Sequence, residues 1–260
     1  MTFLQPFHLV TKSPWPLMGS LATFTFMLSM INLMHFTNTN MIFLAFVISI
    51  LTMYQWWRDI CREATFQGYH TMIVSKNTKS GMLLFIISEI FFFMSFFWAF
   101  FHSSLSPNIE IGSQWPPINI QPFNPLSVPL LNTTILLSSG ISITWAHHSL
   151  IKKHFSETQK ALLVTILLGI LFTILQMWEY YQAPFSISDS IYGTTFFMST
   201  GFHGLHVMIG TTFLLMMYIR LNFNQFSKSH HFGFEASAWY WHFVDIVWLF
   251  LFTFMYWWPY

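Results

Sequence analysis

Charged side chains are scarce in this chain: only 7% of its 260 residues are Asp, Glu, Lys or Arg, whereas 54% are hydrophobic. So few charges cannot cover the surface of a soluble domain of this length, which makes lipid the better solvent for the chain. Ten Lys and Arg residues against nine Asp and Glu residues leave a formal net charge of +1. This weak and scattered charge excludes a nucleic-acid-binding surface.

Cysteine is nearly absent as well, because Cys61 is the only one in the sequence. A single thiol excludes an internal disulfide and any paired-thiolate metal site within the chain. Residues 1–20 lack both the basic-then-apolar layout of a secretory signal and the Arg-rich character of a transit peptide. We therefore expect the chain to keep its first residues.

What the sequence does have is a series of long apolar runs. A helix needs about 20 apolar residues to cross the hydrocarbon layer. Seven runs predict an all-α integral membrane protein with spans at residues 15–34, 41–59, 81–101, 130–150, 161–181, 191–221 and 234–257. The third run can also begin near residue 71, and residues 104–129, which hold six prolines, predict one long loop outside the membrane.

The basic residues all fall on one side of these crossings. They precede the odd-numbered spans or lie at the ends of the even-numbered ones, at Lys12, Arg58, Arg62, Lys76, Lys79, Lys152, Lys153, Lys160, Arg220 and Lys228. By the positive-inside rule, the N-terminus faces the compartment where the chain is made and the C-terminus faces the other side.

Two other classes of seven-helix protein fit this pattern less well. A stand-alone transporter often has inverted halves, which an odd number of spans does not supply. A receptor of the common kind has the opposite orientation, and a retinal protein needs a lysine that the last span lacks.

Glu89 stands in the middle of the third span, within the run SEIFFF at residues 88–93. A charge at this depth costs about 2.5–3.5 kcal/mol, so the carboxyl needs a reason to be there. Two interpretations remain open. Glu89 is either a proton-active or ligand-facing carboxyl, or a protonated acid that is hydrogen-bonded between helices.

The last two spans carry two pairs of polar residues that could act together. His203 and His206 are three residues apart and share a helix face, which suits either a metal or hydrogen bonds between helices. No carboxylate or cysteine follows them at ligand spacing, so we favour the structural role. His242 and Asp245 have the same spacing and predict a structural His–Asp pair.

Other polar residues lie at the ends of spans. The pairs His147-His148 and His230-His231 point in different directions on a helix and indicate polarity at the membrane interface. Glu179 has the same interpretation. We therefore expect no metal site in this chain.

Aromatic and charged side chains gather at the end of the second span, at headgroup depth. Arg58 and Arg62 share a helix face, and their guanidinium groups suit a lipid phosphate held by charge-assisted hydrogen bonds. Generic interfacial anchoring is the alternative. We predict a lipid-binding site made of Trp57, Arg58, Arg62, Glu63 and His70, with Arg220 as a second headgroup contact.

Several motifs together resemble the cytochrome c oxidase subunit III family of the mitochondrial type, and the resemblance runs essentially from end to end. The motifs are PWPL at 14–17, MYQWWRD at 53–59, FQG at 66–68, ISE at 87–89, FFWAF at 96–100, WPP at 115–117, WAHH at 145–148, GFHGLHV at 201–207 and AWYWHFVD at 238–245. The loop at 152–159 and the end at 257–260 depart from the vertebrate pattern, and neither touches a motif.

The resemblance implies seven helices in a two-helix group, residues 1–70, and a five-helix group, residues 71–260, separated by a lipid-filled cleft. It implies a non-redox core subunit of the proton-pumping oxidase that passes electrons from cytochrome c to O₂, with haem and copper in partner subunits I and II. It also implies small accessory subunits, bound phospholipids, and a place in the mitochondrial inner membrane with the N-terminus in the matrix and the C-terminus in the intermembrane space.

The resemblance also carries residue roles. Glu89 matches the buried carboxyl of the family's third helix, and Trp57, Arg62, His70 and Arg220 match positions associated with lipid contact. Subunit III is expected to support proton uptake by subunit I and to protect the catalytic core during turnover.

Overall fold

The computed structural model describes residues 6–37 and 39–260, and this part of the chain folds into helices. The elements are α1 (Trp15–Phe36), α2 (Thr39–Thr65), α3 (Met72–Leu105), the short 3₁₀ helix η1 (Ile109–Ile111), α4 (Val128–Ile151), α5 (Phe155–Tyr181), α6 (Ile191–Asn222), α7 (Phe232–Leu251) and the π-helical η2 (Phe252–Trp257) that continues it. Within the described residues, seven helices are long and apolar enough to cross a membrane. The predicted all-α class and number of spans are confirmed.

Several helices are longer than the apolar runs that predicted them, among them α2 and α5. α5 begins at Phe155 rather than at residue 161, and α2 continues to Thr65 rather than ending near residue 59. Arg62 and Lys160 lie in these extensions. Basic side chains near a helix end reach the lipid headgroups. A helix can therefore continue beyond the hydrocarbon layer, where its sequence no longer needs to be apolar.

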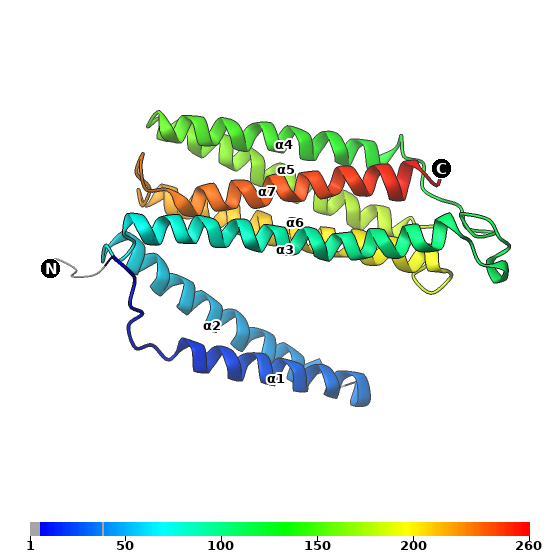
Figure 1. Cartoon of the computed structure of the whole chain (residues 1–260), viewed down its shortest axis with the longest axis horizontal. Coiled ribbons are helices and arrows are strands. Elements are labelled where there is room, and N and C mark those ends of the chain that lie inside the picture. Colours follow the sequence, from blue (N-terminus) through cyan, green and yellow to red (C-terminus); the bar gives the residue numbers. More distant parts are fainter. Residues whose placement is uncertain (1–5, 38) are drawn as a thin grey trace. The chain divides into compact units, whose positions relative to one another are not determined.

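The chain divides into two compact units, residues 1–78 and 79–260, with the boundary inside α3. In the first unit, α1 and α2 pack along each other (Figure 1). The indole Nε1–H of Trp15 donates to Asp59 Oδ2 at 2.7 Å and ties the start of α1 to the end of α2. A Cβ at Gly19 would stand 3.3 Å from the ring of Trp56, so glycine allows this close contact.

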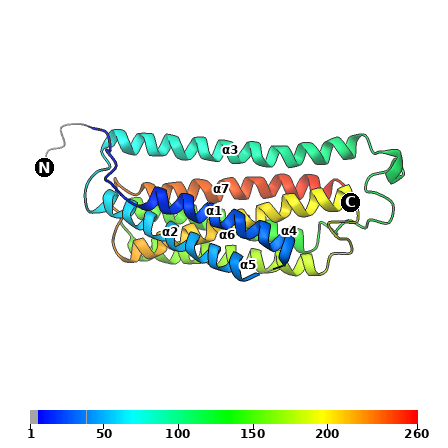
Figure 2. The ribbon, with the colours of Figure 1, turned by 90° about the horizontal axis from the view of Figure 1, so that it is seen from below.

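The core of the second unit is made by α4, α5, α6 and α7, which pack directly on one another (Figure 2). Trp241 and Trp248 of α7 are fully buried in it. Their indole N–H groups donate to Ser139 Oγ at 2.8 Å and to Thr133 Oγ1 at 3.0 Å on α4. Hydrocarbon offers no hydrogen-bonding partner, so such pairs between helices keep the buried indoles satisfied.

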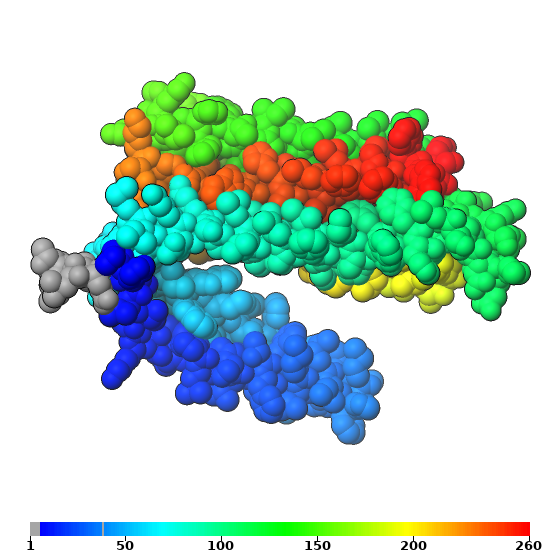
Figure 3. Space-filling view, in the orientation of Figure 1, coloured from blue at the N-terminus to red at the C-terminus, as the bar shows by residue number. Residues whose placement is uncertain are grey.

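In contrast, α3 joins α6 and α7 through aromatic side chains, and it runs alongside α7 in the space-filling view (Figure 3). Phe92 meets Phe202 of α6 with ring centroids 5.1 Å apart, and Phe93 meets Phe243 of α7 at 6.1 Å. Rings of this size hold two helix backbones well apart. The Phe-rich sequence of α3 therefore sets the spacing in which the Glu89 side chain lies.

The closest packing in the second unit generates a stability prediction. A Cβ at Gly169 would overlap Thr211 Cγ2 and stand 2.7 Å from Trp241 Cη2, whereas a Cβ at Gly81 would meet nothing within 4 Å. We expect Gly169→Ala to destabilise the protein by about 1–3 kcal/mol through overpacking. The matched change Gly81→Ala should be neutral or stabilising by up to about 1 kcal/mol, because alanine favours a helix.

Thermal unfolding of both variants in detergent measures the difference. Equal midpoints for the two variants would show that α5 does not approach α6 and α7 this closely.

Candidate functional site

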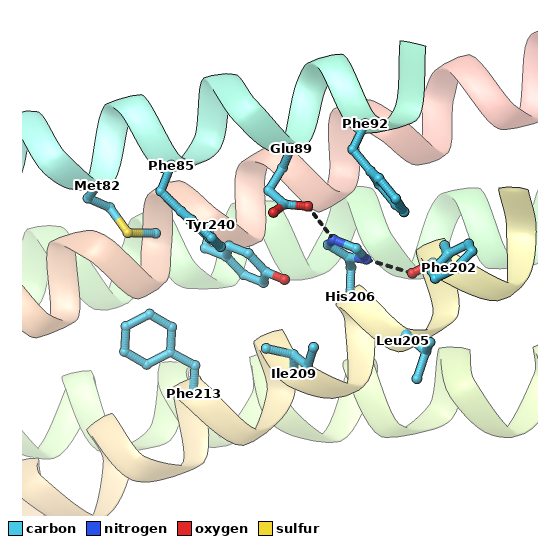
Figure 4. Close-up of a pocket in the computed structure, with 10 residues that line it drawn as sticks. All are labelled: Met82, Phe85, Glu89, Phe92, Phe202, Leu205, His206, Ile209, Phe213 and Tyr240. Carbon is cyan, nitrogen blue, oxygen red and sulfur yellow. Dashed lines mark hydrogen bonds and ion pairs between the residues drawn. The ribbon is translucent and has the colours of Figure 1, made fainter. Parts of the chain in front are cut away.

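Glu89 of α3 faces His206 of α6 within the second unit (Figure 4). The distance from His206 Nε2 to Glu89 Oε2 is 3.0 Å, and the two side chains are 12% and 22% exposed. This is a hydrogen bond between two helices that are far apart in the sequence. The structure thus contains the hydrogen bond between helices that one interpretation of Glu89 requires. This hydrogen bond is also compatible with the other interpretation, a proton-active carboxyl.

The other ring nitrogen of His206 fixes how many protons the pair holds. His206 Nδ1 lies 2.6 Å from the carbonyl oxygen of Phe202. A carbonyl can only accept, so Nδ1 carries hydrogen and donates to it. The contact between Nε2 and Glu89 then needs one more proton, either on the carboxyl or on Nε2. This geometry therefore implies that Glu89 and His206 share one proton.

An open pocket of about 550 Å³ adjoins this pair, with Glu89 and His206 among its lining residues. Most of the remaining wall is apolar, and the Tyr240 ring stacks on His206 with ring centroids 6.2 Å apart (Figure 4). Because the pocket is open, the shared proton is not sealed inside the bundle. An apolar wall also strengthens the hydrogen bond within the pair.

His203 has a different partner from His206, although both lie on α6. Its Nε2 lies 3.2 Å from the carbonyl oxygen of Val244 on α7, and its side chain is fully buried. The interaction supports the structural role predicted for this histidine. The two imidazoles do not converge on one point, since His206 turns to α3 and His203 to α7.

His242 and Asp245 lie near each other, as their spacing predicts, but only loosely. His242 Nδ1 and Asp245 Oδ2 are 3.9 Å apart, which is beyond a hydrogen bond. Asp245 is 7% exposed, and a Cβ at Gly140 of α4 would stand 2.8 Å from its Oδ2. Asp245 thus packs against the backbone of α4 more closely than against His242.

The predicted lipid-binding residues of α2 form a small ionic group in the first unit. Arg58 Nη2 and Arg62 Nη1 lie 3.1 Å and 3.6 Å from the same oxygen, Asp59 Oδ1. Two guanidinium groups share one carboxylate, which leaves an excess positive charge. Trp57 beside them is 63% exposed.

Glu63, His70 and Arg220 lie in other surroundings. Glu63 Oε2 is 3.0 Å from His8 Nε2, and the His8 ring is 6.1 Å from the His70 ring. These contacts hold the segment before α1 against the end of α2. In the second unit, Arg220 donates from Nε to Gln225 Oε1 at 3.0 Å and lies 4.7 Å from the Phe226 ring centroid.

Some neighbours were not visible in the sequence. Glu179, which we assigned to the interface, is 2% exposed, because the last turns of α5 face the interior of the bundle.

His147, His231 and Glu235, from α4 and from the start of α7, lie together. The four-residue spacing of His231 and Glu235 was a usable signal, but nothing in the sequence linked His147 to them.

Comparison with known proteins shows the family of this chain. The family model described as cytochrome c oxidase subunit III matches residues 5–260. Cytochrome c oxidase subunit 3 of Drosophila melanogaster is 60% identical over 254 residues, which cover 98% of this chain and 97% of the relative. The subunit 3 of Rhipicephalus sanguineus is 60% identical over 98% of this chain and 99% of its own length, and that of Papio hamadryas is 59% identical over 98% of both.

The shared proton generates a prediction about two substitutions. Glu89→Gln should keep the fold within about 0.5 kcal/mol of wild type, because the amide N–H can donate to His206 Nε2. Glu89→Ala leaves that nitrogen without its partner, and we expect a loss of about 1–3 kcal/mol. Thermal unfolding of the two purified variants compares them, and an alanine variant as stable as the glutamine variant would refute the pairing.

Proposed function

Because the chain belongs to the cytochrome c oxidase subunit III family, we propose that its Glu89–His206 pair supports proton uptake by the oxidase complex. Membership makes the chain a multi-pass inner-membrane subunit of the mitochondrial haem-copper terminal oxidase. The proposal concerns what this subunit contributes. Haem and copper belong, in our proposal, to partner subunits I and II, and a chain with one cysteine and with His203 and His206 turned apart suits a non-redox role.

We also propose that the N-terminus faces the matrix and the C-terminus the intermembrane space. The basic residues support this orientation, because each lies before an odd-numbered helix, in its first turns, or near the end of an even-numbered one. Matrix-side protons are the ones that such an oxidase consumes. A subunit with proton-binding groups would then help to deliver protons from the matrix to the oxidase.

The single observation that carries the proton role is the 2.6 Å distance from His206 Nδ1 to the carbonyl oxygen of Phe202, from which we infer the tautomer of His206. The bond from Nδ1 to Phe202 leaves Nε2 and Glu89 to share one proton, at the edge of an open pocket. Such a pair accepts a proton without creating an isolated charge, since the proton is bound by both groups. It can therefore hold a proton in an apolar wall and release it to a stronger acceptor.

The pH dependence of turnover tests this role. Glu89→Gln cannot exchange a proton at this position, so oxygen consumption by the purified complex should fall below wild type at alkaline pH, where protons are scarce. At mildly acidic pH the rates should approach each other. The matched control is Glu110→Gln, which changes an exposed carboxyl in η1 and should follow wild type at every pH. Superimposable profiles for all three proteins would contradict the proton role and leave the family membership intact.

A second contribution that we propose is the binding of a phospholipid headgroup at the end of α2. The excess positive charge of Arg58 and Arg62 over Asp59, with the exposed Trp57 beside it, supports this proposal. Arg62 is the stronger candidate for the phosphate, because its side chain is 55% exposed and its distance to Asp59 is the longer one. Arg220, held by Gln225 and Phe226, is proposed as a separate headgroup contact in the second unit.

Replacing Trp57 and Arg62 together by alanine tests the headgroup site. Loss of one charge-assisted hydrogen bond costs about 1.5–3 kcal/mol, so lipid affinity should drop roughly tenfold or more. We expect fewer phospholipids per purified complex and a shorter catalytic lifetime, with a nearly unchanged initial rate. Lys228→Gln removes an exposed basic residue elsewhere and serves as the control. Unchanged lipid content and lifetime in the double variant would remove the site.

A further inference from the structure

Three potential metal ligands meet where α4 ends and α7 begins. His147 lies in the last turns of α4, His231 directly precedes α7, and Glu235 lies one turn into it. Each offers one ligand atom, and these atoms all lie within 4.8 Å of one another. The four-residue spacing places His231 and Glu235 on the same face, and the fold brings His147 to them from another helix.

The orientation of His231 prepares it for coordination. Its Nδ1 lies 3.0 Å from the carbonyl oxygen of Ser227, which can only accept, so Nδ1 carries hydrogen. The lone pair of Nε2 is then free to bind a cation, and Nε2 lies 3.3 Å from Glu235 Oε1. A backbone carbonyl that holds the second nitrogen is the usual support of a metal-binding histidine.

His147 supplies an independent observation. Its Nε2 is buried and has no hydrogen-bond partner among the described residues. Its ring lies at an angle to the His231 ring, with centroids 5.6 Å apart. Buried imidazole nitrogens normally have a partner, and a ligand atom of His147 lies within 4.8 Å of those of His231 and Glu235.

We propose that His147, His231 and Glu235 bind a divalent transition-metal cation of the zinc class. Two imidazoles and one carboxylate form an open zinc site, with water in the fourth position. Ligand bonds of about 2.0–2.2 Å in a tetrahedron place ligand atoms roughly 3.3 Å apart, which His231 and Glu235 already satisfy. The ligand atom of His147 lies within 4.8 Å of the other two and completes the set. Imidazole ligands favour zinc over magnesium or calcium, which prefer oxygen.

Lys79 of α3 regulates this site by its charge. Its ammonium group contacts Glu235 Oε2, the oxygen that does not face His231, and its side chain is 41% exposed. Lys79 therefore leaves the coordinating oxygen free but places a positive charge beside the metal. Removal of this charge should tighten metal binding. If the cluster is only a network of hydrogen bonds and ion pairs, the same change would create no metal affinity.

Zinc titration of the intact oxidase complex, depleted of zinc beforehand, tests the proposal. Binding is measured by equilibrium dialysis against Zn²⁺ and by X-ray absorption at the zinc edge. We expect His147→Gln and His231→Gln to bind one zinc fewer than wild type. His148→Gln is the matched control, because it changes the neighbouring, exposed histidine of the same helix and should bind as wild type does. Unaltered haem spectra and thermal stability verify that the variants are assembled.

Lys79→Met gives a gain that misfolding cannot produce. This variant should bind the zinc severalfold more tightly, and the absorption spectrum should show two imidazoles and an oxygen ligand. Equal zinc content in wild type, His147→Gln and His231→Gln would overturn the proposal. An affinity of Lys79→Met no higher than wild type would overturn it as well.

Discussion

Hydrocarbon cannot hydrogen-bond, so a polar side chain within a membrane span is stabilised by a partner on another helix. The polar contacts that join the helices of the second unit follow from that constraint. Trp241 and Trp248 bind hydroxyl groups of α4, His203 binds a backbone carbonyl of α7, and His206 binds Glu89. These contacts give the apolar bundle a unique arrangement, because packing of similar apolar side chains alone would not distinguish one helix register from another.

The Phe-rich sequence of α3 determines how closely this helix approaches its neighbours. Its rings keep the helix at a distance from α6 and α7, and the remaining space is an open pocket beside Glu89. A tighter helix pair would have buried the carboxyl completely. The pair instead borders this pocket, so the spacing of α3 sets the surroundings of the carboxyl that we propose to bind a proton.

The sequence predicted the seven spans because the thickness of the hydrocarbon layer demands long apolar runs. It did not predict the start of α5 at Phe155, because a helix that continues among headgroups needs no apolar side chains. It identified Glu89 as a residue that needs a partner but not that partner, which lies 117 residues away in the chain. The contact of His147 with His231 and Glu235 was not predicted for the same reason, since contact between helices depends on packing that no local spacing encodes.

The central claim is that Glu89 and His206 share one exchangeable proton. Infrared difference spectroscopy of the purified complex, recorded between acidic and alkaline pH, observes that proton most directly. The account predicts carboxyl and imidazole bands that shift in D₂O and that are missing from the difference spectrum of the Glu89→Gln variant. Identical difference spectra of wild type and variant would contradict it.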